Sequence, residues 1–245
     1  MRRLEVDNVK PNPTASDTDA RNQPVYGITE AARYLRLPPT TLASWVRGQS
    51  YKSHGYARKF RVVIELPDPK VPLLSFLNFV EAHVLAALRR KHNVALPKVR
   101  TALDFVSREL KIDHPLANVR FETDGIDLFV QHLGGLVSAS QQGQIAMRSV
   151  LEAYLKRVER DTDGRAVRLF LFTRTGGDES RDPKIIVVDP SIAFGRPVIA
   201  RRAVATSVVA ERYRAGEGTK ELADDYGCKP EEIEEAVRCE FAQAA

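Results

Sequence analysis

The sequence predicts an α+β protein that is mostly helical. We expect a winged helix-turn-helix at the N-terminal end, a mixed α/β middle, and a three-helix unit like a helix-turn-helix at the C-terminal end. Two observations predict this class. Apolar residues recur at helical spacing through most of the chain. In short runs, bulky side chains alternate with smaller or polar ones, and proline and glycine separate these runs. This pattern predicts strands and turns between the helices.

The chain has 245 residues, which is long enough for two compact domains. Its first 24 residues are rich in Pro, Asn, Asp and Thr, and we expect a disordered tail there. The winged unit is expected over 25–111, a mixed α/β connecting or dimerisation region over 112–182, and the C-terminal helical domain over 183–245. The loop 175–183, TGGDESRDP, is the predicted domain boundary.

Segment 28–47 predicts two short helices joined by a tight turn. Leu37-Pro38-Pro39 ends the first, because proline lacks the donor that a helix interior needs, and Pro39 suits the first turn of the second. Trp45 is spaced for the core, and Gly48 ends the second helix. A wing and two further helices are expected next, over residues 51–66, 75–91 and 97–110.

The middle and C-terminal segments alternate between strand and helix patterns. Asp124-Gly125 is a strong hairpin signal, and it predicts paired strands at Val119–Thr123 and Ile126–Val130. A helix is expected at 149–159 and strands at 166–173 and 185–188. The chain is expected to end with three helices, near 206–215, 218–226 and 230–241.

Charge is distributed unevenly between the two ends of the chain. Between Tyr26 and Arg61 there are seven basic residues and one acid, Glu30. Between Glu217 and Glu240 there are nine acids and three bases. A phosphate polyanion would be attracted to the first segment and repelled by the second.

Several classes of function find no support in the sequence. No apolar stretch is long enough for a membrane span and no secretory signal is seen, so we expect a cytoplasmic protein. Cys228 and Cys239 are expected to stay reduced, and the five histidines do not have metal-ligand spacing. We therefore expect no cofactor and no metal. No nucleophile–base spacing or phosphate-binding glycine loop is seen, so we do not expect an enzyme.

The N-terminal helix pair and wing carry the side chains that a DNA-binding unit needs. Hydroxyl and basic groups on the second helix are expected to contact base edges or phosphates, and the basic residues of the first helix and wing to contact the backbone. The candidate DNA-binding residues are Arg33, Arg36, Thr40, Thr41, Ser44, Arg47, Lys52, Arg58, Lys59 and Arg61.

The N-terminal part contains three stretches in this order: YGITEAARYLRLPPTTLASWV, then the basic wing, then a helix pair ending in NVALPKVRTAL. Over roughly 26–110 they resemble the winged helix-turn-helix of MerR-like regulators. The resemblance implies that the second helix enters the major groove. The sequence departs from single-component MerR-like regulators because it lacks their long coiled-coil helix and their C-terminal metal or drug pocket.

The C-terminal segment shows V-D-P-x-I-x-x-G-R-P-V-I, then T-S-V-V-A-E-R-Y-x-A-G-E, E-L-A-x-D-Y-G and P-E-E-I-E-x-A. Over about 183–241 it resembles the small domain of VapB-type antitoxins. The resemblance implies a protein that binds and neutralises a PIN-like ribonuclease toxin. A Gly and a Pro usual after R-P-V-I are missing from the stretch 200–205, which is Ala-Arg-Arg-Ala-Val-Ala.

Two modes of toxin contact remain open at this stage. An acidic helix could occupy the RNA path as a charge mimic, or an arginine could reach the carboxylates of the toxin. The candidate toxin-binding residues are Arg196, Arg201, Arg202, Glu231, Glu234 and Glu235.

The leading hypothesis is therefore an antitoxin that neutralises its toxin and represses its own operon by binding operator DNA as a homodimer. One alternative is a stand-alone MerR-like transcriptional regulator in which residues 118–174 sense a small molecule. A second alternative is a scaffold whose helix-turn-helix units both bind protein.

Overall fold

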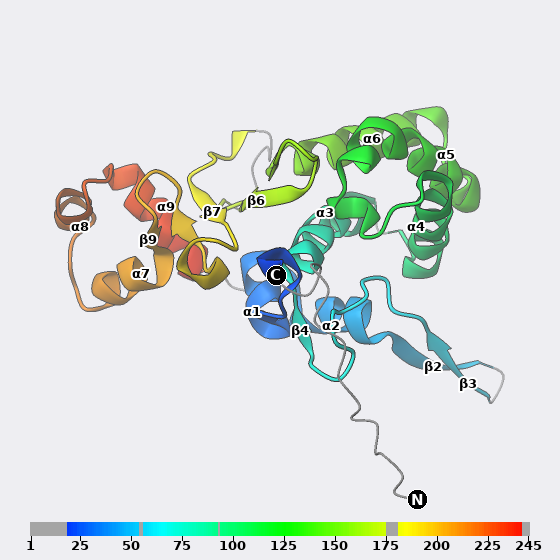
Figure 1. The fold of residues 1–245 in the computed structure, drawn as a ribbon, viewed down its shortest axis with the longest axis horizontal. Helices are drawn as coiled ribbons and strands as arrows, with labels where there is room; N and C mark the ends of the chain where they lie inside the picture. The colour runs from blue at the N-terminus through cyan, green and yellow to red at the C-terminus, as the bar shows by residue number, and fades with distance from the viewer. Residues whose placement is uncertain (1–18, 54–55, 93, 175–180, 242–245) are drawn as a thin grey trace, which may run out of the picture.

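The computed structural model describes residues 19–53, 56–92, 94–174 and 181–241. Figure 1 shows the arrangement: helices α4–α6 lie at one end of the long axis, α7–α9 lie at the other, and α1, α2 and α3 lie between them. The β2–β3 hairpin projects outward beside α2. The molecule is mostly helical, as the sequence predicts.

The N-terminal part is a helix-turn-helix with a projecting hairpin. Pro39 opens the second helix as predicted, and Gly48 follows it with a φ of 72°, in the left-handed region that favours glycine. The paired strands β1 and β4 close the unit at its base. In chain order its elements are η1 (Ala20–Asn22), β1 (Tyr26–Gly27), α1 (Ile28–Tyr34), α2 (Pro39–Arg47), β2 (Gln49–Ser53), β3 (Tyr56–Phe60) and β4 (Leu73–Leu74).

Helix α3 forms the centre of the hydrophobic core, because nearly every side chain from Phe76 to Leu88 is buried. It packs against α6 and η2, and it also buries three polar side chains, Asn78, Glu81 and His83. The elements of this part are α3 (Phe76–His92), α4 (Leu96–Leu110), η2 (Pro115–Ala117), the π-helix η3 (Phe121–Gly125), α5 (Ile126–Val137) and α6 (Gln141–Leu155).

The hairpin expected around Asp124-Gly125 is wrong, because this segment is helical throughout. Ile126, Phe129 and Leu133 are buried at helical spacing, and that pattern outweighs the two-residue turn signal. Gly125 serves packing instead of a turn. A Cβ built there would lie 3.0 Å from Cδ2 of Phe121 and 3.2 Å from Cδ1 of Leu110.

A five-stranded antiparallel sheet joins the middle of the chain to its C-terminal part, in the order β5-β6-β7-β8-β9. Strand β6 comes before the domain boundary expected between residues 182 and 183, and its partner β7 comes after it, so one sheet includes strands from both sides of that boundary. Most of the loop 175–183 lies outside the described residues. The strands are β5 (Val158–Arg160), β6 (Ala166–Phe170), β7 (Ile186–Val188), β8 (Val198–Ile199) and β9 (Val204–Ala205).

Buried Arg157 reinforces the join between the middle and C-terminal parts. Its guanidinium donates to the carbonyl oxygen of Leu171 at 2.6 Å and to that of Asp182 at 2.7 Å. The side chain of Asp182 accepts in turn from the backbone N–H of Thr173 at 3.0 Å. The chain after β6 is therefore held to the chain before β7 by side-chain bonds as well as by the sheet.

The three predicted C-terminal helices are confirmed, as α7 (Thr206–Arg214), α8 (Thr219–Tyr226) and α9 (Pro230–Phe241). Ile233 and Ala236 of α9 are fully buried, and α9 packs against both α7 and α8. Helix α9 also runs back to α1 (Figure 1). Among the described residues, no helix has the length and apolar character that a membrane crossing requires.

Replacing Gly125 with alanine should destabilise the fold by about 1–3 kcal/mol, because the added methyl must displace the side chains of Phe121 and Leu110. Gly135 is the matched control on the adjoining helix, since a Cβ there meets nothing within 4 Å. Gly135→Ala should leave stability unchanged or raise it by up to about 1 kcal/mol. Urea unfolding of both variants measures the difference, and equal effects would contradict this packing role.

Candidate nucleic-acid interface

Helix α2 has a buried face and an open face. Leu42, Trp45 and Val46 point into the core, and Trp45 is fully buried, which confirms its predicted core position. Thr40 and Arg47 are exposed on the other side. An amphipathic helix of this kind presents short polar groups outward from a rigid base.

The chain that returns from the hairpin is fixed to the end of α2. The backbone N–H groups of Val63 and Ile64 donate to the carbonyl oxygen of Trp45, at 2.7 and 3.1 Å. The guanidinium Nε of Arg100 on α4 donates to the carbonyl oxygen of Val62 at 2.8 Å. The hairpin base, α2 and α4 are thus held in one arrangement.

These contacts form a hollow of about 500 Å³ beside α2. Among the described residues no acidic side chain lines it. The N-terminal turn of α4 forms part of its wall, where the partial positive charge of a helix lies. We call it the basic hollow. Its polar lining residues are Thr40, Thr41, Ser44, Arg61, Arg89 and Arg100.

The electrostatics of the basic hollow favour an anion. Burial lowers the pKa of the Arg100 guanidinium; the negative charge of nearby Asp104 opposes this shift, and the positive charge of Arg61 adds to it. Two arginines that repel one another are stabilised by a phosphate placed between them. Trp45 also lines the hollow, and its indole Nε1 is buried without a hydrogen-bond partner among the described residues.

The structure places the predicted DNA-contact residues in two groups around this region. Thr40, Thr41, Ser44 and Arg61 lie together at the basic hollow, with Arg47 at the end of α2. The hydroxyl of Ser44 donates to the carbonyl oxygen of Thr41 at 2.6 Å. The other group lies on the hairpin, where the two strands carry Lys52, Arg58 and Lys59.

The sequence did not indicate Arg89 or Arg100 as interface residues. Arg89 lies near the end of α3, where a basic residue is explained by compensation of the helix dipole. Arg100 lies within the first half of α4, next to buried Val99. Only the tertiary fold brings both to α2, and no local pattern contains that information.

The two basic residues at the end of the first helix are turned away from the open face of α2. Arg36 is buried, has a left-handed backbone with a φ of 53°, and donates to the carbonyl oxygen of Thr173. Arg33 donates to the carboxylate of Glu240 at 2.5 Å. Arg36 is therefore removed from the predicted DNA-contact set, and Arg33 serves a contact inside the protein.

The carboxylate of Glu240 is the centre of a polar seam between α1 and the C-terminal part. It accepts from Thr206 Oγ1 at 2.5 Å and from the hydroxyl of Tyr34 at 3.5 Å, in addition to Arg33. Partial burial opposes the charge of Arg33, but the bond to Glu240 raises its pKa. We call Arg33, Tyr34, Thr206 and Glu240 the seam.

Two further contacts support the seam. The hydroxyl of buried Tyr26 donates to the carbonyl oxygen of Gly195 at 2.9 Å. Arg196, a predicted toxin contact, forms an ion pair with Glu30 of α1. Arg196 therefore has a partner within the chain that joins the C-terminal part to the helix-turn-helix.

Glu235, another predicted toxin contact, is fully buried. It accepts from the hydroxyl of Thr173, from Arg174 Nε at 2.8 Å and from Arg238 at 2.5 Å. It lies on the inner face of α9 and is removed from the predicted toxin surface. The run of acidic residues in the sequence did not reveal that Glu235 is buried, because charge alone does not distinguish the two faces of a helix.

Arg201 and Arg202 fasten the β8–β9 connection to the turn between α8 and α9. Arg201 donates to both carboxylate oxygens of Glu232, at 3.1 and 3.0 Å, and Arg202 donates to the carbonyl oxygen of Gly227 at 2.9 Å. Both arginines remain exposed to solvent. They occupy the stretch that differs from the VapB-type pattern.

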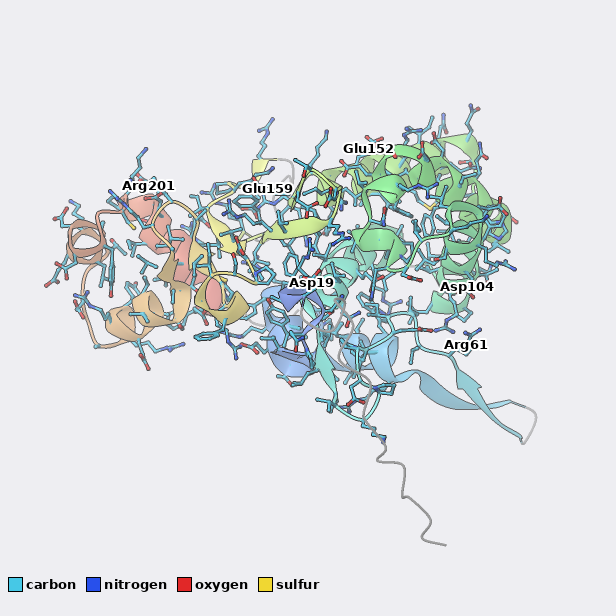
Figure 2. All side chains as sticks on the ribbon, viewed as in Figure 1. Asp19, Arg61, Asp104, Glu152, Glu159 and Arg201 are labelled. Atoms are coloured by element: carbon cyan, nitrogen blue, oxygen red, sulfur yellow. The ribbon has the colours of Figure 1, made fainter. Side chains whose placement is uncertain are left out.

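The remaining acidic residues of α8 and α9 form an exposed acidic end. Glu234 bonds with Arg238 within α9 at 3.1 Å, and the neighbouring acids point to solvent. Figure 2 shows Arg201, beside this end, and Arg61, at the basic hollow, on opposite sides of the molecule. The acidic end comprises Glu221, Asp224, Glu231 and Glu234; Asp225 of α8 is also exposed but forms an ion pair with Arg212.

Neither a metal site nor a disulfide is found among the described residues. No group of three His, Cys, Asp or Glu side chains there is placed to hold a metal ion. Both cysteines are free thiols, and burial raises the pKa of Cys239 to about 12. Cys239 therefore acts as a small apolar side chain in the core.

The fold and the basic hollow define a helix-turn-helix protein with a helical C-terminal unit. Residues 24–103 match the family model described as "Putative DNA-binding HTH domain". Residues 186–238 match the one described as "Protein of unknown function (DUF433)".

Proteins of Mycobacterium tuberculosis are similar to this chain along most of its length. "Putative antitoxin VapB45" is 29% identical over 233 residues, covering 87% of this chain and 92% of the relative. "Uncharacterized protein Rv2308" is 25% identical over 232 residues, covering 91% and 92%. The crystal structure of Rv2018 superposes with a TM-score of 0.64 at 25% identity, covering 88% of this chain and 98% of the other. The chain is thus a distant homologue of the protein named "Putative antitoxin VapB45".

Glu240→Ala should lower the free energy of unfolding by about 1–3 kcal/mol, because it removes the carboxylate that accepts from the Thr206 hydroxyl and pairs with Arg33. Thr206 then keeps only the carbonyl oxygen of Pro197, and Arg33 keeps only the backbone carbonyl oxygen of residue 240. Glu234→Ala on the same helix removes an exposed pair and should cost less than about 0.5 kcal/mol. Urea unfolding compares the two. A loss for Glu240→Ala as small as that for Glu234→Ala would show that the seam does not stabilise the fold.

Proposed function

We propose that this protein is an antitoxin that binds and neutralises a PIN-like ribonuclease toxin and represses its own operon by binding operator DNA as a homodimer. The observation that carries the proposal is the basic hollow beside α2, which combines three arginines, two threonines and a serine with no acid. The similarity to a protein named as an antitoxin supports the toxin-binding part.

In the proposed complex, α2 lies in the major groove and the basic hollow receives a backbone phosphate. Thr40 and Arg47 on the open face of α2 are positioned for base edges and flanking phosphates. Arg61, Arg89 and Arg100 neutralise the phosphate, and the projecting hairpin extends the contact through Lys52, Arg58 and Lys59.

The proposed toxin contact is made by the acidic end. Ribonucleases attract polyanions, so exposed carboxylates at Glu231 and Glu234 would occupy the surface that RNA uses. Arg201 is paired with Glu232, which favours the acidic mode of contact over an arginine that reaches into the toxin. Inhibition of this kind is steric and stoichiometric, and it involves no chemical step.

One observation favours a second function, in which this protein alone senses a small molecule. A hollow of about 900 Å³ lies below the hairpin, between residues 61–68, α4 and residues 112–116. The buried carboxylate of Glu81 lines it and bonds to His114 at 3.0 Å. All of the described residues that line it lie outside residues 118–174, the segment expected to sense the molecule. Ligand-dependent DNA binding by the protein alone, without any toxin, would establish this second function.

Replacing Arg58, Lys59 and Arg61 together with glutamine should weaken binding to a fragment of the gene's own promoter. Each lost phosphate contact should flatten the dependence of log K on log salt by about 1. Lys156→Gln removes an exposed charge elsewhere and should change neither quantity. Shift assays at several salt concentrations provide the measurement, and an unchanged slope in the triple variant would refute the proposed interface.

The combined variant Glu231→Lys and Glu234→Lys reverses charge at the acidic end. It should weaken binding of the proposed toxin, the protein encoded by the neighbouring gene, by at least about 10-fold. Promoter binding should remain. The matched control combines Glu109→Lys with Asp163→Lys, two exposed acids elsewhere. Co-expression and pull-down measure the effect, and full capture by the Glu231/Glu234 variant would place the toxin site elsewhere.

A further inference from the structure

An exposed phenylalanine lies on a strained turn between β7 and β8. Phe194 is 91% exposed, so its ring gains almost no burial within the chain. Its backbone is left-handed, with φ 54° and ψ 35°, and so are those of its neighbours Ala193 and Gly195. A bulky residue in this conformation costs free energy, which the isolated chain does not recover through contacts of the ring.

The core imposes the shape of this turn. The buried hydroxyl of Tyr26 donates to the carbonyl oxygen of Gly195, and the Tyr26 ring stacks on Phe79 with centroids 4.9 Å apart. A Cβ at Gly195 would lie 2.4 Å from the Tyr26 hydroxyl oxygen, so only glycine fits there. The backbone that carries Phe194 is therefore held in this turn by the fold before any partner binds.

A small apolar hollow of about 180 Å³ lies directly beside this ring. Val25, Tyr26, Phe76 and Pro190 line it, Phe194 forms one of its walls, and none of its lining residues is charged. A cavity of about 150 Å³ accommodates one benzene ring. The hollow therefore has the size and polarity that a second phenyl ring requires.

We propose that Phe194 of one copy fills this hollow on a second copy, and that the reciprocal contact forms the two-fold interface of a homodimer. A projecting group and a matching hollow on the same patch are what an isologous interface needs, because each copy supplies both. None of the described residues that line the hollow is charged, so its wall brings no like charges face to face when two identical patches meet. A buried aromatic anchor is also the usual source of most binding energy at an interface.

This interface would join the two copies of the homodimer that is proposed to bind operator DNA. The role of the dimer in DNA binding rests on the proposed function, but the contact between the two copies does not. It is tested without DNA, by sedimentation of the full chain over a concentration series. Failure of the interface is therefore distinguishable from failure of DNA or toxin binding.

Phe194→Gly separates self-association from folding, because glycine relieves the left-handed strain while it removes the ring. We expect the dissociation constant of the dimer to rise by at least about 30-fold. The melting temperature of the monomer should not fall. Ala20→Leu, which narrows the hollow from its exposed lining residue, should weaken the dimer in the same way.

Ile145→Ala is the control, since Ile145 is 58% exposed on α6, at the other end of the molecule. This variant should sediment with the same dissociation constant of the dimer as the wild type. A wild-type chain that stays monomeric at all concentrations would overturn the proposal, and so would a Phe194→Gly variant that remains as dimeric as the wild type.

Discussion

The bond network around the carboxylate of Glu240 is the constraint on which the arrangement of this protein depends. A carboxylate that is nearly buried is costly unless it is paired and hydrogen-bonded. Arg33, Tyr34 and Thr206 satisfy it from two parts of the chain that are more than 160 residues apart in sequence. If the C-terminal unit moved away from α1, the Glu240 carboxylate would lose Arg33 and Tyr34 and keep only Thr206, which belongs to its own unit, so the seam opposes separation.

The seam explains how one chain keeps two oppositely charged surfaces apart. Because α1 is held by α9, the orientation of α2 and of the basic hollow is fixed relative to the C-terminal unit. The acidic end then lies far from the basic hollow along the long axis (Figure 2). In the proposed function, DNA at one end and a toxin at the other do not compete for the same surface, and the acids do not repel the phosphates.

The sequence predicted local structure best where one apolar period extends over a whole element. The bounds of α2, α4 and α7–α9 follow from that period and from Pro39, Pro97 and Pro230 at their starts. It failed at Asp124-Gly125, where a turn signal of two residues competed with a longer helical period. The glycine is needed there for close packing against Phe121, which no local pattern reveals.

The candidate site was predictable only in part, because a pattern of charges does not show whether a side chain points to solvent or into the core. Thr40, Ser44 and Arg61 were expected and lie together at the basic hollow. Arg36 and Glu235 carry the same charges as surface residues, but the fold turns both inward. Arg89 and Arg100 reach the hollow through the packing of α3 and α4 beside α2, which is tertiary information.

The claim that the seam makes one cooperative body is tested most directly by comparing the unfolding of the two ends. Trp45 is the single tryptophan, and its fluorescence reports the core of the helix-turn-helix alone. Amide exchange in α9 reports the C-terminal unit. The account predicts that both signals change at the same urea concentration with the same free energy. Loss of protection in α9 at a lower urea concentration, while the Trp45 signal stays native, would contradict it.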